Sequence, residues 1–298
     1  MTQKKHLVFI MNPISGTRKK EQVPQLAEQL LNSNRYTHTI ALTERPLHAT
    51  ELARAAAEAG AAAVVAVGGD GTVNEVAAGI LHTQTALGII PFGSGNGLAR
   101  HLGIPVNTTA AIQLLNKLHT ITIDGALANG RPFFCTAGMG FDAHIGKLFA
   151  GGSQRGFGSY VRLALQEFVN FSPQRYAIEI DGKKLRRKCF VVTLANAGQY
   201  GNNAYISPEA NIQDGLIDLC LMRPFPALMA LPMGLRLFQR SIHQSEYVEI
   251  LRGEHIRISC SKSDCMHLDG EFLQMEKSLE VKVIPQCLKV VVPATNKE

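Results

Sequence analysis

The feature that most constrains this chain is the segment at residues 64–75, where an apolar run breaks into glycines and then continues as a helix-like stretch. Gly68, Gly69 and Gly71 let the backbone take angles closed to other residues and approach a ligand with no Cβ in the way. The N-terminus of the following helix offers unpaired N–H groups and the positive end of the helix dipole. The segment therefore predicts a turn between a strand and a helix that binds an anion, with polyphosphate as the natural guest.

The spacing excludes two familiar phosphate motifs. The dinucleotide pattern G-x-G-x-x-G would need glycine where Asn74 or Leu98 stands, and the Gly-Lys-Ser/Thr of a P-loop does not occur in the sequence. What remains is a glycine turn with an acid inside it, Asp70. Because Asp70 would repel a bare phosphate, we expect it to meet a cation, a ribose hydroxyl or a substrate hydroxyl proton.

Two other apolar runs end in similar turns. Residues 7–10 lead into Asn-Pro-Ile-Ser-Gly at 12–16, and residues 87–90 lead into Pro-Phe-Gly-Ser-Gly-Asn-Gly at 91–97. Up to residue 122, such strands alternate with helical stretches at 23–31, 49–59, 74–81 and 109–118, which predicts a parallel sheet. Turns at the C-terminal ends of parallel strands lie together and bind ligands. The three turns therefore predict one binding site.

Beyond residue 122 the pattern changes to strands separated by turns. The segments are 121–127, 131–137, 176–180, 189–195, 216–222, 247–252, 255–260 and 279–283. They predict a second, largely antiparallel domain, either a β-sandwich or a half-barrel. A length of 298 residues also suggests two domains.

Composition indicates a soluble enzyme. No apolar stretch approaches the roughly 20 residues that span a bilayer, and residues 1–6 lead straight into a core strand. We expect the protein in the cytoplasm. The six cysteines show no C-x-x-C spacing, so free thiols are favoured over disulfides or a zinc site.

The formal net charge of +6 suggests an anionic partner, and a membrane surface is our first choice. The densest basic run, at 183–188, follows Asp181-Gly182, a hairpin signal. Residues 224–238 are rich in Leu, Met and Phe, with Arg236 and Arg240 at the far end. Either stretch could contact lipid, or be a solvated hairpin and a core helix. Nucleic acid is disfavoured because no aromatic residues are interleaved with the basic ones.

Together these segments resemble the diacylglycerol kinase catalytic family, which includes bacterial lipid kinases, sphingosine kinases and ceramide kinases. The resemblance rests on 12–16, 68–75 and 91–100, and continues in 138–143, 195–198, 207–210, 214–218 and 268–271. It implies an α/β N-terminal domain of the NAD kinase and phosphofructokinase kind at 1–122. A β-sandwich lipid-substrate domain would follow at 123–286, with 287–298 returning to the first domain.

The resemblance also implies an activity: transfer of the γ-phosphoryl group of ATP, with Mg²⁺, to a hydroxyl of a membrane lipid. Glu271 would be the general base, with Asp269 nearby and Asp70 as its rival. The Asp214 carboxylate and the main-chain carbonyls of Asn211 and Leu216 would hold a structural magnesium. The implied nucleotide-binding residues are Asn12, Pro13, Ser15, Gly16, Thr43, Gly68, Gly69, Asp70, Gly71, Thr72, Asn74, Glu75, Gly93, Ser94 and Asn96.

Two positions depart from the family pattern. Many bacterial members have threonine where Ser94 stands and an acid where Gly97 stands, so the acceptor, diacylglycerol or a sphingoid base, stays open. Two other classes also stay open: an NAD kinase-like enzyme with a soluble substrate, and a nucleotide-binding regulator without catalysis. For the lipid kinase we expect peripheral contact with the inner face of the membrane, as a monomer or a homodimer.

Overall fold

The computed structural model describes residues 3–13, 20–151, 157–260, 264–275 and 277–294. The chain divides into two compact units. The first unit comprises residues 1–123 and 286–298, and the second comprises residues 124–285. Strand β18 (Ser278–Val291) contributes residues to both units.

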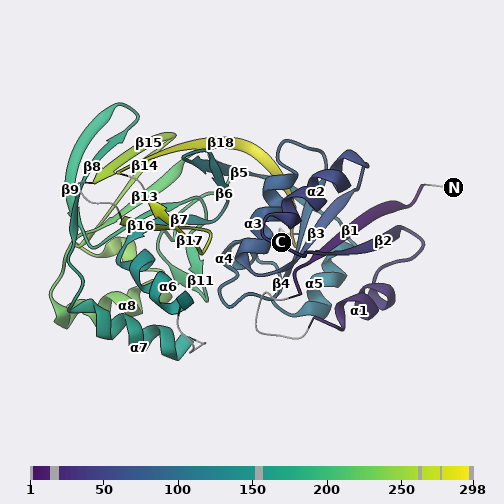
Figure 1. Ribbon diagram of the computed structural model, residues 1–298, viewed down its shortest axis with the longest axis horizontal. Coiled ribbons are helices and arrows are strands. Elements are labelled where there is room, and N and C mark those ends of the chain that lie inside the picture. The colour runs from purple at the N-terminus through teal and green to yellow at the C-terminus, as the bar shows by residue number, and fades with distance from the viewer. Residues whose placement is uncertain (1–2, 14–19, 152–156, 261–263, 276, 295–298) are drawn as a thin grey trace. The chain divides into compact units, whose positions relative to one another are not determined.

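The first unit is built on a parallel sheet with the strand order β2-β1-β3-β4-β18 (Figure 1). Every residue of β3 and β4 is buried, as expected for strands covered on both faces. This confirms the parallel α/β sheet predicted from the sequence. The bounds are β1 (Lys5–Met11), β2 (Tyr36–Leu42), β3 (Ala63–Gly68) and β4 (Ala86–Pro91).

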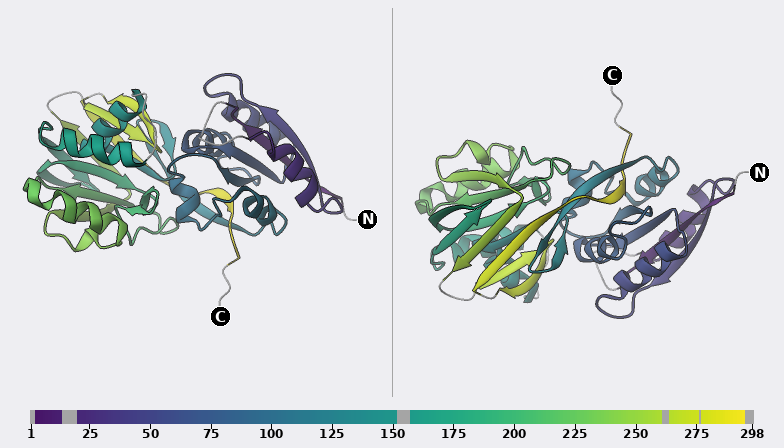
Figure 2. Two further views of the ribbon diagram at one scale, coloured as in Figure 1. Left: turned by 90° about the horizontal axis from the view of Figure 1, so that it is seen from below. Right: turned by 90° about the horizontal axis from the view of Figure 1, so that it is seen from above.

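Helices cover both faces of this sheet (Figures 1 and 2). One face is covered by α1 (Val23–Leu30) and α5 (Thr108–Leu115), whose apolar side chains share a core with β1, β3 and β4. The other is covered by α2 (His48–Glu58) and α3 (Asp70–Gly79). These two helices pack closely, since a Cβ on Gly79 would lie 2.5 Å from the carbonyl oxygen of Thr50.

The second unit contains two antiparallel sheets that enclose a common core. One has the order β14-β13-β10-β7-β16-β17, and the other runs β18-β15-β8-β9 with β5 beside β18 and β6 beside β5. Strands β11 and β12 pair as a separate two-stranded sheet. Apolar side chains from both sheets form one buried cluster, which confirms a mainly antiparallel β-sandwich. The bounds are β5 (Thr120–Ala128), β6 (Arg131–Phe133), β7 (Thr136–Gly140), β8 (Gln174–Ile180), β9 (Lys183–Cys189), β10 (Val191–Ala195), β11 (Gln199–Gly201), β12 (Ala204–Tyr205), β13 (Ile217–Met222), β14 (Val248–Gly253), β15 (His255–Cys260), β16 (Asp264–Leu268) and β17 (Glu271–Met275).

The helical segments of the second unit are α6 (Phe141–Gly151), α7 (Phe157–Phe168), η1 (Ala227–Met229), α8 (Ala230–Phe238) and η2 (Ile242–Gln244). An aromatic-rich cluster joins α7, η1 and α8 to the β10–β13–β14 side of the six-stranded sheet. Within the described ranges, no helix is both long and apolar enough to cross a membrane.

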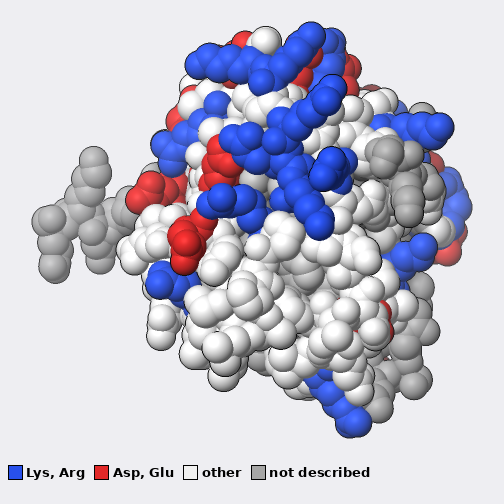
Figure 3. All heavy atoms as spheres, turned by 90° about the vertical axis from the view of Figure 1, so that its left-hand side faces the viewer, with Lys and Arg blue, Asp and Glu red and all other residues white. Residues whose placement is uncertain are grey.

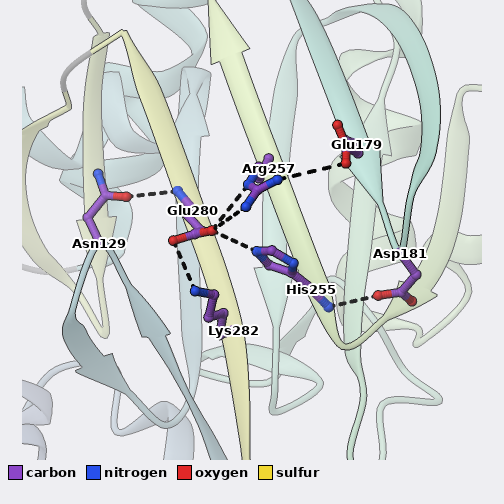
Figure 4. Close-up of polar contacts among 7 residues, drawn as sticks. All are labelled: Asn129, Glu179, Asp181, His255, Arg257, Glu280 and Lys282. Atoms are coloured by element: carbon purple, nitrogen blue, oxygen red, sulfur yellow. Dashed lines mark hydrogen bonds and ion pairs between the residues drawn. The ribbon is translucent and has the colours of Figure 1, made fainter.

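A network of ion pairs lies on the strands β15 and β18 of the second unit (Figure 4). Glu280 accepts hydrogen bonds from His255 Nε2 at 2.8 Å and Arg257 Nη2 at 3.0 Å, and Lys282 Nζ lies 3.3 Å from its other oxygen. These three partners lower the pKa of Glu280 to about 2. Because the carboxylate of Glu280 is exposed to solvent, we expect these surface ion pairs to add little to the free energy of unfolding.

Element boundaries differ from the sequence-based expectation where a distant residue intervenes. The predicted strand at 131–137 splits into β6 and β7, because the N–H groups of Phe134, Cys135 and Thr136 all turn toward the carboxylate of Asp269. The predicted strand at 279–283 continues without a break to Val291 in β18. Helix α3 starts at Asp70, so the glycine turn itself opens the helix.

Candidate functional site

The three predicted turns follow β1, β3 and β4, which are neighbours in the parallel sheet of the first unit. Of the turn at 12–16, the structure describes Asn12 and Pro13. The N–H of Asn12 donates to the carbonyl of Val67 at 3.4 Å, and that of Phe92 donates to Gly68 at 2.7 Å. Hydrogen bonds between the strand ends therefore hold the turns together.

Asp70 ties two of these turns to each other. Its Oδ2 accepts a hydrogen bond from the N–H of Asn96 at 3.0 Å, and its Oδ1 accepts one from Gly97 at 2.8 Å. Gly97 begins the short helix α4 (Gly97–His101), so the carboxylate binds the start of that helix. Asn96 is left-handed, with φ 52°, and its Nδ2 donates to the carbonyl of Gly93 at 2.8 Å. The β3 and β4 turns form one hydrogen-bonded unit.

The same two turns touch through their glycines. A Cβ on Gly69 would lie 3.3 Å from the Cα of Gly93. A Cβ on Gly93 would lie 2.9 Å from the Cα of Gly69 and 2.8 Å from Asn96 Oδ1. Backbone meets backbone here, so a side chain at either position would push the turns apart.

Gly93→Ala is therefore expected to weaken the ATP binding that the sequence predicts at these turns by about tenfold, and to lower the free energy of unfolding by roughly 1–3 kcal/mol. The added methyl group meets the rigid backbone of Gly69 rather than a movable side chain. Titration calorimetry with ATP and urea denaturation measure the two effects. Gly234→Ala is the matched control, since a Cβ there has nothing within 4 Å. Equal ATP affinity in the two variants would contradict the tight-turn interpretation.

Two other predicted nucleotide-binding residues, Thr72 and Thr43, contact the strand ends from which the turns begin. A Cβ on Gly68 would lie 2.4 Å from Thr72 Oγ1, so the buried Thr72 side chain packs on the glycine backbone. The N–H of Thr43, after β2, donates to the Met11 carbonyl at 3.0 Å.

The remaining predicted nucleotide-binding residues differ in their contacts and in their exposure to solvent. Glu75 accepts hydrogen bonds from the N–H groups of Leu47 and Ala49, both at 3.1 Å, and so holds the start of α2. Ser94 is exposed. The half-buried Gly71 and Asn74 lie in the first turns of α3, and Pro13, two residues after the end of β1, is exposed. The predicted residues Ser15 and Gly16 lie outside the described residues.

Lys20 is a site residue that the sequence did not single out. It is 5% exposed, its Nζ donates to the carbonyl of Asn12, and it lies 5.6 Å from the ring centroid of Phe92. Burial lowers the pKa of Lys20 to about 8. In the sequence it is one of three consecutive basic residues, a pattern that normally indicates exposed charge. Here it places a buried ammonium group among the turns.

This burial predicts a pH effect on stability. The pKa of Lys20 is about 8 in the folded state against an ordinary 10.5, so the unfolded state binds more protons between these pH values. The contribution of Lys20 to the free energy of unfolding must therefore rise as the pH increases from 8 to 10.5. Urea denaturation of the wild type and Lys20→Met across this window should show the wild type gaining relative to the variant. A difference between the wild type and Lys20→Met that stays flat across this window would contradict the prediction.

In the second unit, Asp269 and Glu271 belong to the hairpin turn between β16 and β17. Asp269 has φ 47° and Gly270 has φ 85°, so both central residues are left-handed. Asp269 is buried and its carboxylate accepts hydrogen bonds from three consecutive N–H groups, at 2.9 Å (Phe134), 2.8 Å (Cys135) and 3.0 Å (Thr136). Glu271 is exposed at the first position of β17. The two acids of one turn thus have different surroundings.

The predicted magnesium loop is a series of tight turns. Asn211 Oδ1 accepts the N–H of Gln213, and Asp214 Oδ1 accepts that of Leu216, both at 3.1 Å. Asp214 is exposed. Within the described ranges, no group of three or more His, Cys, Asp and Glu residues gathers as a metal site. A magnesium ion here would rely on one carboxylate, main-chain carbonyls and water, which is a donor set that this ion accepts.

Asp124 supports this loop and was not predicted. It is fully buried, its Oδ2 accepts the N–H of Gly215 at 2.8 Å, and its own N–H donates to the Ile212 carbonyl at 2.8 Å. An acid in the middle of the apolar stretch at 121–127 was the signal that could have revealed it.

A buried polar cluster in the second unit was also missed. Asp142 Oδ2 lies 3.2 Å from the hydroxyl of Tyr200, 3.4 Å from that of Thr193 and 3.4 Å from His267 Nε2. A Cβ on Gly138 would lie 2.4 Å from both Asp142 Oδ2 and His267 Nε2, so this glycine makes room for the cluster. Burial is the main cause that raises the pKa of Tyr200 well above its usual range. The Gly-Met-Gly-Phe-Asp-Ala motif contained Asp142, but its partners come from other strands.

Comparisons with known proteins match both parts of the chain to known domain families. Residues 6–128 match the family model of the diacylglycerol kinase catalytic domain, and residues 135–292 match that of the YegS C-terminal NAD kinase beta sandwich-like domain. The chain is 29% identical to a "Probable lipid kinase YegS-like" of Chromohalobacter salexigens, over 85% of this chain and 84% of that protein. It is 27% identical to a diacylglycerol kinase of Bacillus subtilis, over 89% of each.

A solved structure has the same fold. The crystal structure of a diacylglycerol kinase from Bacillus anthracis superposes with a TM-score of 0.74 at 20% identity, covering 98% of each chain. The two family models together span nearly the whole chain, so the family resemblance includes the second unit as well as the turns of the first. The chain belongs to the diacylglycerol kinase catalytic family.

Proposed function

We propose that this protein is a kinase that uses magnesium ATP to phosphorylate a hydroxyl of a membrane lipid. The observation that carries the proposal is the pair of glycine turns after β3 and β4, joined by Asp70 and in backbone contact at Gly69 and Gly93. Such a surface lets phosphates approach the main chain closely. The family membership supports phosphoryl transfer as the reaction.

The nucleotide would bind along the three turns of the first unit. Helix α3 begins inside the β3 turn, so its unpaired N–H groups and dipole favour phosphate there. The buried ammonium of Lys20 adds positive charge beside Asn12 and Phe92. Magnesium would neutralise the phosphate charge, and Asp214 with the carbonyls of Asn211 and Leu216 would hold a structural ion.

Glu271 is the candidate general base. Both oxygens of Asp70 and both oxygens of Asp269 accept backbone N–H groups, which gives these two acids positioning roles. Glu271 differs, since its residue is exposed at the start of a strand. A base must reach the proton of the acceptor hydroxyl, and an exposed side chain is the one able to do so.

The acceptor is proposed to be a lipid with a free hydroxyl, of the diacylglycerol or sphingoid-base type. The named relatives are a diacylglycerol kinase and a YegS-like lipid kinase, which supports a lipid over NAD. An enzyme with such a substrate would act from the cytoplasmic side, in peripheral contact with the membrane.

The test is transfer of labelled phosphate from ATP, with magnesium, to a total lipid extract of the host, with NAD offered in parallel. A single labelled lipid, identified by mass spectrometry, would support the proposal and name the acceptor. Label in NAD alone would overturn it in favour of a soluble-substrate kinase. A folded protein that binds ATP and labels neither would favour the regulator.

A further inference from the structure

Strand β17, which begins with Glu271, is the last strand of its sheet. Among the described residues it pairs with β16 alone, so ladder hydrogen bonds hold it on one side only. Segments with few such contacts open locally more readily than the centre of a sheet. A general base, however, must stay within roughly 0.5 Å of its working position. An edge strand that carries the base therefore needs a second anchor besides its pairing with β16.

Helix α6 contacts β17 through Phe272, the residue after Glu271. A Cβ on Gly146 of α6 would lie 2.2 Å from Cζ and 2.4 Å from Cε1 of Phe272. The ring therefore lies directly on the helix backbone, at a position where the helix has no side chain. Successive side chains of a strand point to opposite faces. Packing of Phe272 on α6 thus fixes β17 from the face opposite to that of Glu271.

His267 extends this contact to the neighbouring strand. It stands directly opposite Phe272 in the register of β16 and β17, and the two ring centroids lie 6.2 Å apart, edge to face. Its Nε2 lies 3.4 Å from Oδ2 of Asp142, in the first turn of α6. The residue is 6% exposed, and its Nδ1 has no hydrogen-bond partner among the described residues. Because such burial costs stability, the contacts with Asp142 and Phe272 are what explain a histidine here.

The contacts of Gly146 with Phe272 and of Asp142 with His267 together form what we call the α6 anchor. It holds both strands of the hairpin, since His267 belongs to β16 and Phe272 to β17. The room for it is built into the sheet: a Cβ on Gly138 would lie 2.4 Å from both Asp142 Oδ2 and His267 Nε2.

The α6 anchor lies apart from the basic surface of the second unit. In Figure 3 lysines and arginines gather over the upper part of the side that faces the viewer, where the β8–β9 hairpin lies in Figure 1, whereas α6 lies lower. Lys184, Arg186 and Lys188 of β9 are exposed, and β9 belongs to the other sheet. Substitutions on α6 leave this charge in place. A loss of turnover in them would therefore not come from weaker attraction of an anionic substrate.

We propose that Phe272 and His267 are positioning residues for Glu271. Through these two side chains, α6 holds the β16–β17 hairpin so that the carboxylate of Glu271 keeps the orientation that proton transfer requires. The inference rests on the proposed function, since it takes Glu271 as the base. Both residues act through Glu271, so their loss should lower kcat and leave KM for ATP unchanged.

Gly146→Ala tests the α6 anchor. The added methyl group meets the ring of Phe272 and should push β17 away from α6. With the acceptor lipid dispersed in detergent, kcat should fall on the order of tenfold, while KM for ATP stays within about twofold. Amide hydrogen exchange of the hairpin without substrate should become at least about tenfold faster. Gly158→Ala on α7 is the matched control, since a Cβ there has nothing within 4 Å, and it should match the wild type in both measurements.

The double variant Gly146→Ala/Phe272→Leu tests whether the two residues act together. Leucine is smaller than phenylalanine and leaves room for the added methyl group, so the double variant should regain most of the lost kcat and exchange more slowly than Gly146→Ala. Two losses of stability with no shared cause would instead add. A double variant with kcat no higher than that of Gly146→Ala would overturn the proposal.

Phe272→Ala removes the same contact without adding an atom, which keeps the test open if Gly146→Ala does not fold. Leu273→Ala is its matched control, because Leu273 is also half-buried on β17 but packs into the core on the other face. Phe272→Ala should lower kcat at least about tenfold more than Leu273→Ala. Equal values of kcat in these two variants would overturn the proposal.

Hydrogen exchange separates this inference from the proposed function, because it needs no substrate. Faster exchange of the hairpin in Gly146→Ala, in a protein whose wild type labels no lipid, would overturn the kinase and leave the α6 anchor supported. Unchanged exchange and unchanged kcat in Gly146→Ala, in an enzyme that labels lipid, would overturn the α6 anchor alone.

Discussion

Glu271→Gln is expected to reduce phosphoryl transfer on the order of a thousandfold, the range lost when a general base is removed. Glutamine keeps the shape of the side chain but cannot accept the hydroxyl proton at neutral pH. ATP affinity should stay within about twofold, because the nucleotide turns belong to the first unit and Glu271 to the second. Initial rates with labelled ATP and calorimetric titration of ATP measure the two effects.

Glu254→Gln serves as the control for Glu271→Gln, since Glu254 is an exposed acid in the turn between β14 and β15. Its turnover should match that of the wild type. If Glu271→Gln retained full turnover, Glu271 would not be the base. Asp70 would then return as the candidate, despite the two N–H groups that its carboxylate binds.

Asp269→Ala is expected to lower the free energy of unfolding by roughly 4 kcal/mol, because it leaves three buried N–H groups without their acceptor at about 1–3 kcal/mol each. These groups belong to Phe134 and Cys135, which separate β6 from β7, and to Thr136, the first residue of β7. The loss should appear in urea denaturation followed by a probe of the second unit. The loss of stability should be the same with no substrate present, because Asp269 is expected to position the backbone rather than to contact the substrate.

Asp214→Ala offers the comparison for Asp269→Ala, since Asp214 is an exposed acid whose carboxylate binds a single N–H group. In the absence of magnesium its loss should cost less than about 1.5 kcal/mol. If Asp269→Ala kept its stability but lost turnover, Asp269 would act on substrate rather than on the fold.

Much of the fold could be predicted because the decisive patterns are local. Fully apolar runs such as Val64–Val67 predicted buried parallel strands, and Asp181-Gly182 predicted the β8–β9 hairpin, whose two turn residues are left-handed at φ 46° and 81°. The three glycine turns were placed at one sheet edge because parallel strands must end together. Each inference used periodicity or turn chemistry within about ten residues.

The candidate site was less accessible to the sequence, because its polar groups find partners far along the chain. Asp269 and Glu271 are two residues apart and look equivalent, yet Asp269 is buried against N–H groups 133–135 residues away. Lys20 looks like surface charge until the β4 turn brings Phe92 beside it. Asp142 and His267 meet across 125 residues, in space left by Gly138.

By itself, then, the sequence determined the alternation of strands and helices, the glycine turns and the division into two kinds of domain. These follow from local backbone preferences and from which side chains avoid water. Only the tertiary structure decided which acids bind the backbone, which lysine is buried and which strands α6 contacts. Those outcomes depend on desolvation and on hydrogen-bond partners from distant strands, and packing alone brings such partners together.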